Sequence, residues 1–237
     1  MFRTAAIILA AGQGKRMQSA VAKQFLLLND EPVVCHSLRA FEESGVEMII
    51  LVTGADEMEY CREEIVKKYG FKKVSAIVAG GKERYHSVYE GLCVLDGMLE
   101  ADGIVLIHDG ARPMITQEII ERTIDAAKAH GACVAAMPVK DTIKVADADG
   151  FAAMTPDRST LWQIQTPQTF TYELIYGAYK KLLSDEKYQK GITDDAMVVE
   201  SMCGGHVKLV KGSYENIKVT TPEDMIVAES FLRSRRV

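Results

Sequence analysis

The chain has 237 residues, 48% of them hydrophobic, which is enough for a substantial core in one domain. Its formal net charge of −5 and pI of about 5.6 argue against a nucleic-acid partner, because proteins that grip that backbone usually carry a basic face. No apolar run approaches the ~20 residues of a membrane span, so we expect no membrane partner. The five cysteines are scattered without a C-x-x-C pair, which argues against a zinc site or a disulfide framework and favours a cytoplasmic location.

Short apolar runs alternate with helical patterns along the chain. The runs lack polar alternation, as expected of strands covered on both faces, and they predict strands at 4–10, 47–53, 74–79, 103–109 and 132–138. The intervening segments predict helices near 33–44, 56–69, 83–99 and 116–130. This alternation predicts an α/β fold: a Rossmann-like, mostly parallel sheet with helices on both faces, in a single domain over 1–237.

Residues 142–155 break this rhythm. Two strand-like pieces flank DADG there, and Asp149-Gly150 is a strong tight-turn signal. A lone hairpin is only marginally stable in water, so it must pack on something. We expect a homodimer joined through a protruding hairpin arm at about 138–160; an extra hairpin on the parent sheet is the alternative.

Two helix starts near the C-terminus are marked by capping residues. Thr221 precedes Pro222 and two acidic residues, which predicts a helix over the apolar positions of 225–232. Asp194 and Asp195 could suggest a metal pair, but capping of a helix through 195–203 explains them better.

A glycine-containing loop, LAAGQGKRM at 9–17, follows the first predicted strand. The dinucleotide pattern G-x-G-x-x-G/A fails at Met17, where only a small residue lets helix and strand approach closely. The Walker pattern fails at Leu9, where its first glycine should stand, and at Arg16, where the magnesium-binding hydroxyl should stand. Both common phosphate loops therefore fail at their functional positions.

The loop nevertheless has the components of an anion site. Small residues let backbone N–H groups close on phosphate, and cations follow at Arg16 and Lys23. Arg16 can offer a planar fork and Lys23 a mobile point charge, which suits a triphosphate under attack at one phosphorus. An ordinary glycine loop with surface cations is the alternative. The predicted phosphate contacts in the loop are Ala10, Ala11, Gly12, Gly14 and Lys15.

A set of short motifs continues along nearly the whole chain: AKQF (22–25), GGKERYHSV (80–88), HDGARP (108–113), PVKDTIK (138–144), TPDRSTLWQIQTPQTF (155–170), TDDA (193–196) and NIKVTTPED (216–224). In this order they resemble the 2-C-methyl-D-erythritol 4-phosphate cytidylyltransferase family of the non-mevalonate isoprenoid pathway. The ribitol-5-phosphate cytidylyltransferases share several of them and remain the alternative. Ala22 stands where a proline is common in the family, and Lys82 where an acidic residue is common.

The resemblance implies a reaction between CTP and methylerythritol 4-phosphate that releases pyrophosphate. Arg16, Lys23 and Lys218 would be the catalytic cations around the attacked phosphorus. A catalytically silent nucleotide-sugar binding subunit is a third possibility, but such a protein has no need of these charges. Taken alone, Lys218 would be read as a surface lysine at a strand end.

The remaining site residues are also implied by the resemblance. Gly80, Gly81, Lys82 and Ser87 would read cytosine, although a plain strand-to-helix turn is the alternative. Asp109 would contact sugar hydroxyls or position Mg²⁺, which the nucleotide phosphates would mainly hold. The methylerythritol phosphate would be bound by Arg112, Thr142, Arg158 and Thr166, with Thr142 and Arg158 carried by the arm. The role of Arg84 stays open, and His108 is expected to be a packed histidine.

Overall fold

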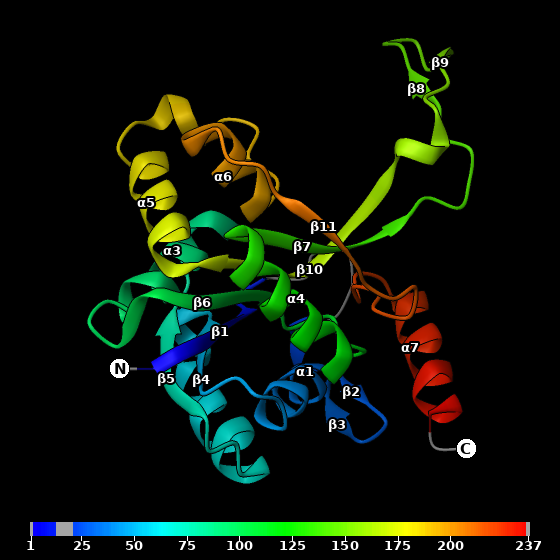
Figure 1. Ribbon diagram of the computed structural model, residues 1–237. Coiled ribbons are helices and arrows are strands. Elements are labelled where there is room, and N and C mark those ends of the chain that lie inside the picture. The colour runs from blue at the N-terminus through cyan, green and yellow to red at the C-terminus, as the bar shows by residue number, and fades with distance from the viewer. Residues whose placement is uncertain (1, 13–20, 236–237) are drawn as a thin grey trace.

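The computed structural model describes residues 2–12 and 21–235 (Figure 1). Its strands are β1 (Phe2–Ala10), β2 (Leu27–Leu28), β3 (Glu31–Pro32), β4 (Met48–Thr53), β5 (Val74–Ala79), β6 (Leu99–Asp109), β7 (Ala132–Pro138), β8 (Val145–Ala146), β9 (Ala152–Met154), β10 (Trp162–Thr171) and β11 (Lys208–Lys211). Its α-helices are α1 (Val33–Glu42), α2 (Met58–Tyr60), α3 (Arg84–Val94), α4 (Gln117–His130), α5 (Tyr172–Leu183), α6 (Asp195–Cys203) and α7 (Pro222–Ser234). A π-helix, η4 (Cys61–Lys67), continues α2, and short 3-10 turns are η2 (Lys23–Phe25), η3 (Ala55–Glu57), η5 (Arg158–Thr160) and η6 (Glu186–Gln189).

Seven of the described strands form one sheet in the order β11-β7-β10-β6-β1-β4-β5. Strand β10 runs antiparallel to both of its neighbours, and the other described pairs in this sheet are parallel. The five predicted strands and the mostly parallel α/β fold are confirmed. The sequence patterns missed β10 and β11, which lie on the β7 side of the sheet.

Helices cover both faces of the sheet because alternate strand residues point to opposite sides. Ile8 and Leu106 belong to a core with α1, η4 and α4, while Ile7 and Ile107 belong to a second core with α3, α5 and α6. The unbroken apolar runs of these strands therefore reflect burial on both faces.

A third, small core supports the C-terminal helix. Leu28 and Val33 pack with Val219 and Ala228 of the segment leading into and along α7. Thr221 is the predicted N-cap of α7 and forms a capping box with Asp224, and Pro222 is the first residue of the helix. The chain that follows the glycine loop is thereby held next to the chain around residue 218.

The hairpin β8–β9 projects away from the sheet, as Figure 1 shows in green above the rest of the molecule. Its turn follows the predicted DADG: Gly150 has a φ of +86°, and the Asp147 carboxylate accepts hydrogen bonds from two backbone N–H groups of the turn. Large apolar side chains on the arm are exposed, among them Phe151 at 73% and Met154 at 56%. The predicted arm is confirmed as a protruding element.

Candidate active site

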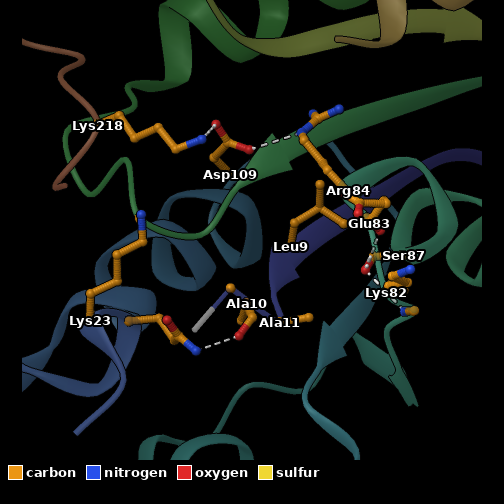
Figure 2. Close-up of a pocket in the computed structure, with 14 residues that line it drawn as sticks. Leu9, Ala10, Ala11, Lys23, Lys82, Glu83, Arg84, Ser87, Asp109 and Lys218 are labelled. Atoms are coloured by element: carbon orange, nitrogen blue, oxygen red, sulfur yellow. Dashed lines mark hydrogen bonds and ion pairs between the residues drawn. The ribbon is translucent and has the colours of Figure 1, made fainter. Parts of the chain in front are cut away.

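A cavity of about 710 Å³ opens where β1 and β6 end, the edge at which ligands gather in open α/β sheets. Figure 2 shows that segments far apart in the sequence meet there. The lining residues are Leu9, Ala10, Ala11, Gly12, Lys23, Gln24, Gly81, Lys82, Glu83, Arg84, Ser87, Asp109, Ala111 and Lys218. Most of the residues predicted to bind the nucleotide are therefore brought together. Gly14, Lys15 and Arg16 lie outside the described residues.

Two of the predicted catalytic cations reach this cavity from opposite ends of the chain. Lys23 begins η2, and Lys218 follows β11 by seven residues. In Figure 2 the two lysines lie on one side of the view, with Ser87 and Lys82 on the other. The cavity can therefore hold phosphates near the lysines and a base near Ser87.

Hydrogen bonds to backbone carbonyl oxygens hold the segments that carry both lysines in place. The buried Gln24 side chain donates to the carbonyl oxygen of Ala10 at 2.6 Å, which fastens η2 to the end of β1. Val219, next to Lys218, donates to the carbonyl oxygen of Ala111 at 2.8 Å. Gln24 stands in the AKQF motif but was not predicted as a site residue, because a glutamine gives no signal of burial in the sequence.

The opposite wall is a tight turn between β5 and α3. Ser87 Oγ accepts from the N–H of Gly81 at 3.2 Å and lines the cavity. A Cβ atom at Gly80 would lie 2.6 Å from Ser87 Oγ and 2.7 Å from the Ala11 side chain. Glycine is required at position 80 because two walls of the cavity approach each other there. Lys82 and Glu83 also line this wall.

Asp109, the last residue of β6, is surrounded by cations. Its Oδ2 atom lies 2.8 Å from Lys218 Nζ and 3.6 Å from Arg112 Nε, and its Oδ1 atom lies 3.5 Å from Arg84 Nε. Burial alone would raise the pKa of Asp109, but the charges of Arg84, Lys218 and Arg112 outweigh it and hold that pKa far below its usual range. Asp109 is therefore a fixed anion that orients Lys218.

Arg84 also binds a second carboxylate behind the cavity wall. Its two terminal nitrogens donate to the oxygens of Asp195 at 2.8 and 2.7 Å, and Asp195 is fully buried. The Tyr179 hydroxyl donates to the same carboxylate. Burial and the charge of Asp195 raise the pKa of Tyr179, so the hydroxyl keeps its proton. The sequence left Arg84 open because its partner lies 111 residues away.

Residues 194 and 195 do not form the metal pair that their sequence could suggest. Asp194 is the N-cap of α6, with its carboxylate accepting from the N–H of Met197 at 3.0 Å, as expected for a cap. Asp195 instead forms the ion pair with Arg84.

Thr166 and His108 support the end of β6, where Asp109 lies. The Thr166 hydroxyl oxygen accepts from the N–H of Asp109 at 3.1 Å, and His108 Nε2 donates to the Arg112 carbonyl at 3.3 Å. His108 Nδ1 is then the acceptor for the Thr166 hydroxyl at 2.9 Å. Burial lowers the pKa of His108 to about 4, so the ring is a neutral, packed histidine, as expected. That Thr166 contacts the alditol stays a prediction.

The other predicted substrate residues lie outside the cavity wall of this chain. Arg112 is largely buried, and its guanidinium donates to the carbonyl of Asn216 at 2.8 Å, beside Asp109. Thr142 and Arg158 are exposed at the base of the arm, where Arg158 donates to the Lys140 carbonyl at 2.8 Å. Their contact with substrate stays a prediction.

None of the described helices is long and apolar enough to cross a membrane. Comparison with known proteins gives one consistent result. The family "IspD: 2-C-methyl-D-erythritol 4-phosphate cytidylyltransferase" matches residues 4–234. Proteins of that name from Alkaliphilus oremlandii and Lachnospira eligens are 51% and 52% identical, over 99% and 96% of this chain and 97% and 98% of theirs.

A solved structure agrees with the sequence matches. The crystal structure of 4-diphosphocytidyl-2C-methyl-D-erythritol synthase from Anaerococcus prevotii superimposes with a TM-score of 0.83 at 36% identity, covering 97% of this chain and 96% of that one. Together with a cavity that joins the glycine loop, Asp109 and Lys218, these matches settle the family. The chain belongs to the 2-C-methyl-D-erythritol 4-phosphate cytidylyltransferase (IspD) family.

Proposed function

We propose that this chain transfers the cytidylyl group of CTP to 2-C-methyl-D-erythritol 4-phosphate and releases pyrophosphate, in isoprenoid precursor synthesis. The observation that carries the proposal is the convergence of Lys23 and Lys218 on one cavity whose opposite wall, at Gly81 and Ser87, offers backbone and hydroxyl groups to a base. The family match covers almost the whole chain and supports the same reaction.

The chemistry needs alignment and charge neutralisation more than it needs a protein nucleophile. A phosphate monoester is already ionised near neutral pH, so no base has to activate it. In-line attack on the α-phosphorus brings two groups of negative charge together. Lys23 and Lys218, with Arg16 of the glycine loop, would neutralise that charge in the transition state.

Magnesium fits this site as an ion held mainly by the nucleotide. Among residues 2–12 and 21–235, no three histidine, cysteine, aspartate or glutamate side chains gather into a metal-binding group. Asp109 is an ionised carboxylate in the cavity wall, and Mg²⁺ is commonly bound by one or two carboxylates and substrate phosphates. When bound, the ion would neutralise charge on the triphosphate and the departing pyrophosphate.

The substrate is tested by measuring pyrophosphate release with CTP and Mg²⁺, comparing methylerythritol 4-phosphate with ribitol 5-phosphate. The proposal expects preference for methylerythritol 4-phosphate. Preference for ribitol 5-phosphate would favour the polyol-phosphate relative instead, and no turnover with either would favour a silent binding subunit.

We further infer that the active enzyme is a cytoplasmic homodimer joined through the arm. The arm exposes Ile143, Val145, Phe151 and Met154, and a hairpin of this kind is marginal without a partner. Arg158, at the base of the same arm, would then reach the neighbour's active site.

The shared site is tested by mixing an Arg158→Ala chain with a Lys23→Ala chain. Each alone should be nearly inactive, and mixed dimers should recover activity because one of the two sites keeps both residues. Heterodimers that form without any recovered activity would count against the shared site.

A further inference from the structure

Two helix N-termini meet at the cavity wall, where an ion pair joins a partly exposed arginine to a buried carboxylate. Arg84 is the first residue of α3 and Asp195 the first residue of α6. The two terminal nitrogens of Arg84 bind the two oxygens of Asp195 at 2.8 and 2.7 Å, the bidentate geometry that fixes a guanidinium in direction as well as position. The Tyr179 hydroxyl holds the same carboxylate from α5.

The row of charged side chains continues from Arg84 into the cavity. Arg84 Nε lies 3.5 Å from one oxygen of Asp109, and Lys218 Nζ lies 2.8 Å from the other. Charges therefore alternate in sign from Asp195 through Arg84 and Asp109 to Lys218. Because a different cation faces each Asp109 oxygen, rotation of the carboxylate would disturb the Lys218 contact. Figure 2 shows the forward part of this row, from Arg84 to Lys218.

Fold stability alone does not account for Arg84. A helix N-terminus favours negative charge, so an arginine at the first position of α3 is opposed by the helix dipole. An ion pair whose carboxylate is buried is also weak evidence for stability, because apolar residues of similar volume often serve as well. The ion pair with Asp195 does orient the Arg84 guanidinium, because it holds Nε of Arg84 towards Asp109.

We propose that Arg84, oriented by Asp195 and Tyr179, is a positioning residue that fixes the Asp109 carboxylate and, through it, the Lys218 ammonium for cytidylyl transfer. The inference rests on the proposed function, in which Lys218 acts at the reacting phosphates.

The test uses the double variant Arg84→Gln/Asp195→Asn, which removes both charges and leaves neither buried alone. We expect kcat to fall roughly tenfold to hundredfold, the cost of misplacing a catalytic group, while KM for CTP changes by less than about threefold. The single variant Arg84→Lys should fold and still lose roughly tenfold in kcat, because an ammonium cannot hold Asp195 at two points while facing Asp109. A purely structural ion pair would tolerate lysine.

A matched control is Arg39→Gln/Glu31→Gln. Arg39 binds both oxygens of Glu31 at 2.9 and 2.8 Å, away from the cavity lining, and its loss should leave kcat unchanged.

A second measurement does not depend on activity. In the free protein, the rate of Lys218 acetylation by acetic anhydride, followed by mass spectrometry, should rise severalfold in the double variant, because an Asp109 carboxylate that Arg84 no longer fixes holds the amine less firmly. Unchanged Lys218 labelling, or wild-type kcat, in folded double variant or Arg84→Lys would overturn the inference. If wild-type protein failed to turn over CTP and methylerythritol 4-phosphate, the proposed function would fail, and the labelling result would still decide the role of Arg84.

Discussion

Replacing Lys218 by alanine should abolish most of the activity while leaving the fold intact. A unit charge about 4 Å from the charge developing at phosphorus is worth about 4 kcal/mol at an effective dielectric constant of 20. Because the Lys218 side chain is 37% exposed, solvent screening should reduce this to roughly 3 kcal/mol, or a loss in kcat on the order of 10². The loss in kcat is measured by steady-state pyrophosphate release with saturating CTP.

Stability should fall far less than activity in this variant. Lys218 is partly exposed, and Arg84 and Arg112 still face Asp109 at 3.5 and 3.6 Å, so the carboxylate is not left alone. The loss should be about 1 kcal/mol, which lowers Tm by about 2–4 °C in a chain of this size. Lys68→Ala, which breaks an exposed pair with Glu64, is the control and should keep full activity. A folded Lys218→Ala enzyme with kcat within threefold of wild type would show that Lys218 does not act at the reacting phosphates.

Three further predictions concern pH and glycines. The pKa of His108 falls from 6.5 to about 4 on folding, so the unfolded chain binds the proton first and the free energy of unfolding drops as pH falls from 6.5 towards 4. Urea unfolding at pH 7 and at pH 4.5 should therefore show a loss that is about 2 kcal/mol larger for wild type than for His108→Gln. Equal losses in the two proteins would contradict the burial of His108. Gly80→Ala should raise KM for CTP by tenfold or more, which corresponds to roughly 1.4 kcal/mol, because its Cβ atom would push Ser87 from the cavity wall. Gly45→Ala is the control and should leave KM unchanged, because the space around Gly45 is open. Gly177→Ala, exposed inside α5, should raise the free energy of unfolding by about 0.5–1 kcal/mol; a lower Tm would show an unseen clash.

Hydrophobic patterns predicted the strands that apolar residues dominate and missed β10, a strand that is largely buried from Gln165 onward but has a polar sequence. Gln165 and Gln168 are 7% and 2% exposed, yet they are hydrophilic by any scale. Their side-chain amides are hydrogen-bonded in the structure. Gln165 donates to the Ser213 carbonyl, and Gln168 donates to the Asp194 carboxylate and accepts from the N–H of Ala196. A strand whose buried side chains form hydrogen bonds to neighbouring segments has no apolar periodicity to detect.

The site was predictable where motifs mark it and unpredictable where distant residues pair. Glycine and cation patterns, read with the family resemblance, identified Gly81, Ser87, Asp109 and Lys218, which all line the cavity. The contact between Arg84 and Asp195 depends on how α3 and α6 are placed around the sheet, and no local pattern carries that information.

Lysines from two ends of the chain should converge on a single CTP, and a crystal structure of the chain with CTP would show whether they do. We expect the cytosine to lie against Gly81 and Ser87, with the phosphates extending towards Lys23 and Lys218. A nucleotide seated on another surface, or one whose phosphates leave the cavity on the side away from both lysines, would contradict it.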